Sequence, residues 1–170
     1  WQFAETYFAK GNQLYTQGKL QEAIASFEKC LELDSSYLPA RFNLGVILGN
    51  LGQYSQAIEQ LEQVIQAEAR HAEAYNSLGF IYSQQRQLDR AITYYRQAIN
   101  VAPKFAQAHY NLGMTLLQLG EYQEGWKEYE WRLQTPQFMA FDPPQYRWQG
   151  EDISDKNLLV HTEQGVKEII

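Results

Sequence analysis

The strongest constraint on this 170-residue chain is a sequence period of 34 residues. One column of the aligned units holds glycine throughout: Gly11, Gly45, Gly79 and Gly113. A second column holds a small residue: Ala23, Ala57, Ala91 and Gly125. Similarity at a fixed period of this length is the signature of stacked structural repeats. We therefore expect four units, over about 4–37, 38–71, 72–105 and 106–134.

Each unit has the apolar spacing of two helices, which we name helix A and helix B. In the second unit the apolar residues recur every three or four positions: Leu44, Ile47, Leu48 and Leu51, then Ala57, Ile58, Leu61, Val64 and Ile65. Between the two stretches stand Gly18, Gly52 and Gly120, which suit a left-handed helix end. Arg86 takes that place in the third unit, so we expect a slightly different turn there.

Several of these features resemble the tetratricopeptide repeat, over residues 4 to about 134. They are the pairs Leu44-Gly45, Leu78-Gly79 and Leu112-Gly113, the small residue in each helix B, and Pro103 between units. The resemblance implies an all-α fold, a right-handed superhelical array of four helical hairpins followed by an irregular, aromatic-rich tail. It divides the chain into an array over 1–134 and a tail over 135–170. Arg132 should end the array, with Trp126 and Trp131 covering its last hydrophobic face.

In such an array helix A lines the concave face, so its residues that face away from helix B form a candidate peptide-binding groove. These residues are Phe8, Asn12, Tyr15, Phe42, Asn43, Val46, Asn50, Asn76, Ser77, Phe80, Gln84, Tyr110, Asn111, Met114 and Gln118. Amides both donate and accept, which suits an extended backbone, and aromatic rings supply apolar anchors. The alternative interpretation makes the aromatics, Phe80 among them, part of the core and the amides solvated surface.

The stretch Ala108–Leu112 is similar to repeats of O-GlcNAc-transferase-like proteins, in which a ladder of asparagines holds the substrate backbone. Asn43 and Asn111 occupy the place of that ladder, whereas Ala9 and Ser77 interrupt it. Lysine and arginine are missing from the predicted face, which disfavours capture of a terminal carboxylate.

The tail resembles the junction between a repeat array and a bacterial glycosyltransferase-like domain. The resemblance rests on three segments: Tyr129–Arg132, Trp148–Glu151 and Leu158–Gly165. It implies a strand through His161 that leads into a loop and helix, and a parent protein that continues beyond this chain. Val166–Glu168 departs from the family pattern, so nucleotide-phosphate binding is not carried over. Phe141, Tyr146 and Trp148 are too apolar for a free linker, so we expect them to pack back on the fourth unit. The alternative to the junction is a C-terminal cap made of aromatics and one strand.

Other classes of function find little support. The net charge of −6, without a basic cluster, disfavours nucleic acid and anionic membranes as partners. His71, His109 and His161 lack metal-ligand spacing and suit structural roles, and residues 1–134 carry no catalytic motif, so we expect no metal, cofactor or enzyme site. Cys30 is the only cysteine, and we expect it to be a small buried hydrophobic residue. A chain without an intrachain disulfide suits a reducing compartment, so we expect a bacterial cytoplasmic protein.

The sequence thus predicts a scaffold that binds a peptide or partner protein in its concave groove. One alternative is the substrate-recruiting part of a glycosyltransferase whose catalytic domain is absent from this chain. Another is an assembly scaffold that self-associates through Trp1, Phe3 and the tail aromatics.

Overall fold

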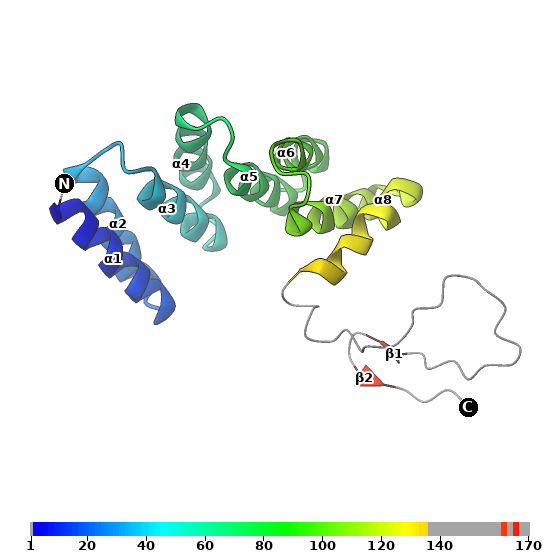
Figure 1. Cartoon of the computed structure of the whole chain (residues 1–170), viewed down its shortest axis with the longest axis horizontal. Coiled ribbons are helices and arrows are strands. Elements are labelled where there is room, and N and C mark those ends of the chain that lie inside the picture. The colour runs from blue at the N-terminus through cyan, green and yellow to red at the C-terminus, as the bar shows by residue number, and fades with distance from the viewer. Residues whose placement is uncertain (1, 136–160, 163–164, 167–170) are drawn as a thin grey trace, which may run out of the picture. The chain divides into compact units, whose positions relative to one another are not determined.

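A computed structural model describes residues 2–135, 161–162 and 165–166 in two units, 1–132 and 133–170 (Figure 1). The helices are α1 (Gln2–Thr16), α2 (Leu20–Leu33), α3 (Leu38–Asn50), α4 (Tyr54–Ala67), α5 (Ala72–Gln84), α6 (Leu88–Val101), α7 (Ala106–Leu119) and α8 (Tyr122–Tyr129). A 3-10 helix, η1 (Glu130–Gln134), follows α8, and the strands β1 (His161–Thr162) and β2 (Gly165–Val166) lie in the second unit.

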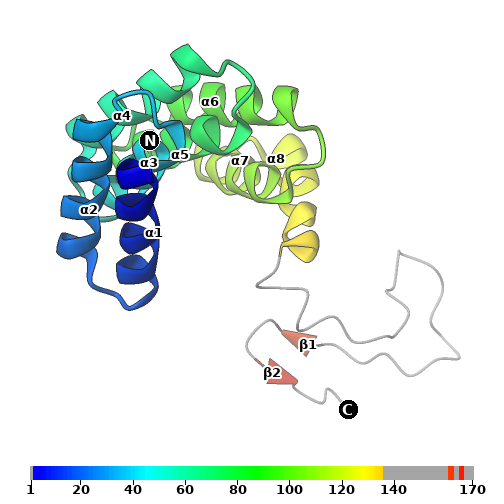
Figure 2. The ribbon, with the colours of Figure 1, turned by 60° about the vertical axis from the view of Figure 1, so that its left-hand side comes forward.

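The first unit is a row of four helical hairpins. Each odd-numbered helix packs against the even-numbered helix that follows it, and α3, α5 and α7 also contact one another in sequence (Figures 1 and 2). The odd-numbered helices are the helices A of the sequence pattern, and the even-numbered ones are the helices B. The predicted all-α class, an array of helical hairpins, is confirmed.

Glycine allows the two helices of each hairpin to approach closely. A Cβ atom added at Gly11 would lie 2.6 Å from the ring of Phe27, and one added at Gly79 would lie 2.6 Å from the ring of Tyr95. Real Cβ contacts are longer than this, so a larger residue would force the hairpin open. The same close approach joins Gly45 to Leu61 at 2.8 Å.

One continuous hydrophobic core runs through all four hairpins, from Ala4 in α1 to Leu116 in α7. Each hairpin adds buried side chains to it, as expected for a stacked array rather than a central ball. Cys30 is buried in this core, and its burial raises the pKa of the thiol. The predicted role of Cys30 as a small buried hydrophobe is confirmed.

The turns inside the hairpins share one backbone conformation. Gly18, Gly52 and Gly120 have φ angles of 74°, 77° and 84°, and Arg86 has 61°. The residue after each left-handed position donates its N–H to a carbonyl five residues earlier, as Gln87 N does to Tyr82 O at 2.9 Å. The expectation of a different turn at Arg86 is therefore wrong, because this arginine adopts the glycine conformation.

The last hairpin differs from the others. α8 has 8 residues, whereas α2, α4 and α6 have 14 each. Trp131 stacks on His109, with ring centroids 4.1 Å apart, but Trp126 is 56% exposed. The expected cover by two tryptophans therefore holds for Trp131 and is wrong for Trp126.

In the second unit, β1 and β2 pair antiparallel, with His161 opposite Val166 and Thr162 opposite Gly165. The expected strand through His161 is present over two residues, and Gly165 and Val166 form a second strand rather than a loop or helix. The rest of the expected loop and helix lies outside the described residues. The predicted strand residues 157–160 lie outside the described residues, as do Phe141, Tyr146 and Trp148. No helix in the described part of the chain is long and apolar enough to cross a membrane.

A candidate peptide-binding groove

Three adjoining hollows form a groove along the helices A, with volumes of about 310, 280 and 370 Å³. The first and second share Val46, Asn76 and Ser77. The second and third share Phe80 and Asn111. Because neighbouring hollows share lining residues, they make one continuous surface, which we call the concave groove.

Most of the predicted groove residues line these hollows: Tyr15, Phe42, Asn43, Val46, Asn50, Asn76, Ser77, Phe80, Gln84, Tyr110, Asn111, Met114 and Gln118. Two do not. Phe8 packs its ring against Phe27 and Tyr37, at centroid distances of 5.9 and 5.1 Å. Asn12 accepts a hydrogen bond from Asn43 and lies outside the lining.

Large apolar side chains face solvent within the groove. Tyr15 is 44% exposed, Phe80 37% and Met114 38%. Phe80, for which a core position was the alternative, lines the second and third hollows. The groove therefore offers apolar area that the array itself does not cover, the kind of surface that partners bind.

Asparagine side chains link neighbouring helices A. Asn43 Nδ2 donates to Asn12 Oδ1 at 2.8 Å, which ties α3 to α1. Asn111 Nδ2 donates to Asn76 Oδ1 at 3.0 Å, which ties α7 to α5, and Asn111 Oδ1 accepts from Gln107 Nε2 at 3.0 Å. A primary amide has two N–H donors and an oxygen with two lone pairs, so each still has capacity for a ligand. The side chains predicted to hold a peptide backbone are thus already oriented by the array.

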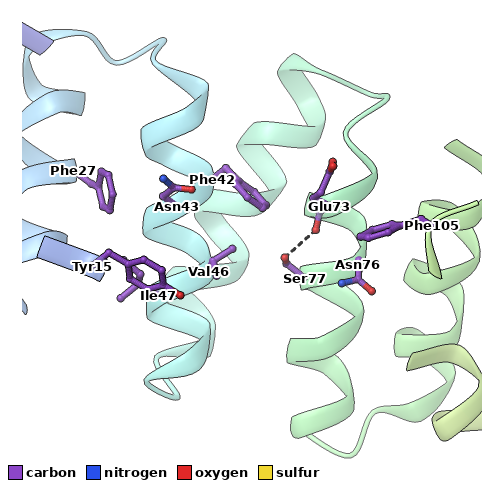
Figure 3. Close-up of a pocket in the computed structure, with 10 residues that line it drawn as sticks. All are labelled: Tyr15, Phe27, Phe42, Asn43, Val46, Ile47, Glu73, Asn76, Ser77 and Phe105. Atoms are coloured by element: carbon purple, nitrogen blue, oxygen red, sulfur yellow. Dashed lines mark hydrogen bonds between the residues drawn. The ribbon is translucent and has the colours of Figure 1, made fainter. Parts of the chain in front are cut away.

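The first hollow opens between α3 and α5, where the described residues make no such amide pair (Figure 3). Its apolar walls include Phe42, Val46 and Ile47 from α3, and Phe105 from the start of α7. Asn43 of α3 and Asn76 of α5 also line it. The hollow is therefore mostly apolar, with two amides in its wall.

Two charged residues line the groove, one near each end of α5. Glu73 borders the first hollow and Arg86 the third. The Nδ1 atom of His71 lies 3.4 Å from the Glu73 carboxylate, but it accepts the N–H of Ala74 at 3.2 Å. A nitrogen that accepts this hydrogen bond does not donate a proton to Glu73. Arg86 corrects the expectation that the face carries no lysine or arginine.

The sequence pattern missed Phe105, Gln107, Glu73 and Arg86 as lining residues. Phe105 precedes α7, in the same column of the repeat as Tyr37 and His71, which precede α3 and α5. The recurrence of a ring side chain in this column is the sequence signal that could have pointed to Phe105.

Two histidines occupy structural positions. His71 caps the N-terminus of α5 through Ala74 N, and its ring lies 4.8 Å from that of Phe42. His109 is buried: its Nε2 contacts the carbonyl oxygen of Pro103 at 3.0 Å, and its Nδ1 pairs with the Glu128 carboxylate. Among the described residues, no group of His, Cys, Asp and Glu is placed to hold a metal ion.

A separate hollow of about 460 Å³ lies on the other side of the array, between α2 and α4. Leu44 and Leu48 of α3 line it together with Ile24 and Ala25 of α2, and glutamines and glutamates form the rest of its border. It shares no lining residue with the three hollows of the concave groove. The groove is therefore the better candidate for an extended ligand.

Comparison with known proteins agrees with this architecture. Residues 14–79 match a family model described as tetratricopeptide repeat, and residues 81–120 match one described as TPR repeat. MamA from Desulfovibrio magneticus RS-1 superimposes with a TM-score of 0.69 at 27% identity, over 75% of this chain and 72% of that one. The first TPR domain of Spaghetti (RPAP3), solved bound to the HSP90 peptide SRMEEVD, gives a TM-score of 0.67 at 22% identity, over 70% and 94%.

Protein FlbA of Caulobacter vibrioides is 43% identical over 53 residues, which are 30% of this chain and 9% of FlbA. This chain therefore spans only a small part of FlbA. None of these comparisons supports the transferase-like junction expected for the tail, which stays a prediction. Both family models and the four helical hairpins lead to one conclusion: this chain belongs to the tetratricopeptide-repeat proteins.

Proposed function

We propose that this chain is a protein-interaction scaffold that binds an extended segment of a partner protein in the concave groove. The observation that carries the proposal is the continuity of the three hollows across α3, α5 and α7. An extended peptide presents alternating side chains and unpaired backbone groups along its length. A groove that alternates exposed apolar side chains with amides matches that pattern.

Two further observations support a peptide as the ligand. The hydrogen bonds of Asn43 and Asn111 hold their side chains in place before binding, which reduces the entropy lost when a ligand arrives. The RPAP3 structure shows that the shared fold can hold a peptide. Its likeness to this chain extends to the fold, so the peptide it binds is not carried over.

The recruiting part of a glycosyltransferase would use the same groove, and would differ in having a catalytic domain beyond Ile170. That alternative stays a prediction. Self-association through the terminal aromatics and a cytoplasmic location, where Cys30 would be reduced, also stay predictions.

The proposal is tested by selecting peptides from a displayed random library on the immobilised full chain. Affinities of the selected peptides are then measured by calorimetry for Phe80→Ala, Tyr110→Ala and Asn111→Ala. Truncating a buried anchor costs about 1–3 kcal/mol, so each variant should weaken binding roughly five- to hundredfold.

Gln56→Ala, in the hollow between α2 and α4, is the matched control and should bind like the parent chain. Circular dichroism shows whether each variant keeps its helices, which matters because Tyr110 also contacts the ring of Tyr129. Unchanged affinity in all three groove variants, or a loss in Gln56→Ala alone, overturns the groove assignment.

A further inference from the structure

The first hollow of the groove has an origin in the repeat itself. In the first two hairpins an aromatic residue of helix A packs on the residue that precedes the next helix A: Phe8 on Tyr37, at 5.1 Å, and Phe42 on His71, at 4.8 Å. One period after Phe42 stands Asn76, and one period after His71 stands Phe105. The third pair therefore lacks one ring.

Asn76 is too small to cover Phe105, and both residues line the first hollow (Figure 3). Phe105 has no aromatic partner among the described residues. The hollow measures about 310 Å³, at the lower end of the range of ligand pockets. It is large enough for one bulky side chain and too small for a folded element.

The border of the same hollow carries one unbalanced charge. The Glu73 side chain is 62% exposed, and the nearby Nδ1 atom of His71 accepts the N–H of Ala74 instead of donating to the Glu73 carboxylate. Ser77 Oγ donates to the backbone oxygen of Glu73 at 2.8 Å rather than to its carboxylate. A cation on the ligand beside the apolar anchor would meet this carboxylate.

We propose that the first hollow is the specificity pocket of the groove, and that it takes one bulky apolar side chain of an extended partner segment with a neighbouring lysine or arginine. The anchor side chain occupies the place of the ring that Asn76 does not supply, against Phe105. The cationic neighbour lies at Glu73. This assignment rests on the proposed function of the groove and adds which side chains the partner must have.

The test uses the full chain labelled with ¹⁵N and titrated by NMR with three synthetic heptapeptides of Gly and Ser. One carries adjacent Trp and Lys, the second Ala and Lys, and the third Trp and Glu. Loss of one buried anchor side chain should weaken the Ala peptide roughly ten- to hundredfold. The Glu peptide should bind about two- to fivefold more weakly, and Glu73→Gln should remove that difference.

Two variants at position 76 separate the pocket from the amide pair. Asn76→Phe fills the hollow and removes the hydrogen bond with Asn111, whereas Asn76→Ala removes the hydrogen bond and leaves the hollow open. We expect Asn76→Phe to lose at least tenfold in affinity for the Trp–Lys peptide and to have an equal or higher melting temperature, because its ring packs on Phe105. Asn76→Ala should lose less affinity than Asn76→Phe, because it removes the hydrogen bond that orients Asn111 but leaves the hollow open. Asn76→Leu fills the same space and replaces the Phe variant if that one does not fold.

The pocket assignment is overturned if the Ala peptide binds as well as the Trp peptide, if none of the three binds, or if Asn76→Phe and Asn76→Ala lose affinity equally. The proposed function survives these results if library-selected peptides still depend on Phe80 and Tyr110. If no selected peptide depends on those two residues, both the function and the pocket fail.

Discussion

Replacing Arg86 with glycine should stabilise the array, because Arg86 occupies a backbone conformation that glycine adopts without strain. Its φ angle is 61°, beside 74–84° at Gly18, Gly52 and Gly120. The left-handed conformation costs a residue with a Cβ atom about 1–2 kcal/mol. Glycine in turn loses about 0.4–1 kcal/mol more backbone entropy on folding. The net gain for Arg86→Gly is therefore about 1 kcal/mol.

The reciprocal change, Gly52→Arg, isolates the backbone term. A Cβ atom added at Gly52 meets no other atom within 4 Å, so the substitution creates strain without a steric clash. It should destabilise the array by about 1 kcal/mol. Gln85→Gly is the control, because Gln85 has a φ of −80° and glycine there adds entropy to the unfolded chain alone. It should cost about 0.5–1 kcal/mol.

Urea and thermal unfolding, followed by circular dichroism, measure all three changes. A difference of 1 kcal/mol moves the melting temperature by about 2–4 °C in a domain of 150–250 residues. The same substitution, to glycine, should thus raise stability at position 86 and lower it at position 85. If Arg86→Gly is neutral or destabilising, the strain assigned to this turn is refuted.

Three further outcomes are expected from the core. Burial raises the pKa of Tyr95 to about 12, although a hydrogen bond with Ser83 acts in the opposite direction. The tyrosine of the unfolded chain therefore loses its proton first, near pH 10. Up to about 3 kcal/mol of folding stability is present below pH 10 and is lost as the pH rises through 12. Tyr95→Phe should flatten that part of the alkaline stability curve in urea titrations, and an unaltered curve would contradict the assignment. Gly79→Leu should cost roughly 1–3 kcal/mol, because its Cβ would already lie 2.6 Å from Tyr95, whereas Gly49→Ala meets the flexible end of Ile81 at 3.1 Å and should cost less. Cys30 should react with a thiol reagent only after denaturant is added, because it is buried and its pKa is raised; rapid labelling of the native chain would place it at the surface.

The period of the sequence was enough to predict the hairpins and the side of each helix A that faces the groove. Phe80 and Met114 stand one period apart in sequence and both line the groove. A repeat register assigns a face because helices repeat every 3.6 residues and neighbouring units stack alike. Residues on that face could therefore be chosen without any tertiary contact being known.

The register could not predict which side chains on that face meet each other. Asn43 and Asn12 lie in different columns, yet their amides pair between α3 and α1. Such contacts depend on the offset between helices, which spacing within one helix does not contain. The conformation of Arg86 was missed for another reason: residue preference disfavours it, and the hydrogen bonds of the turn override that preference.

The close approach of Gly11 to Phe27 and of Gly79 to Tyr95 has a consequence for how such chains can lengthen or shorten. Each glycine and the ring it contacts belong to one hairpin, sixteen residues apart. Duplication or deletion of a whole hairpin keeps every such pair intact, whereas a break between helix A and helix B sets a glycine opposite a side chain it was not matched to. The segment that can be duplicated or deleted without breaking these pairs is therefore the hairpin. The boundaries of such duplications or deletions should fall in the loops before α3, α5 and α7.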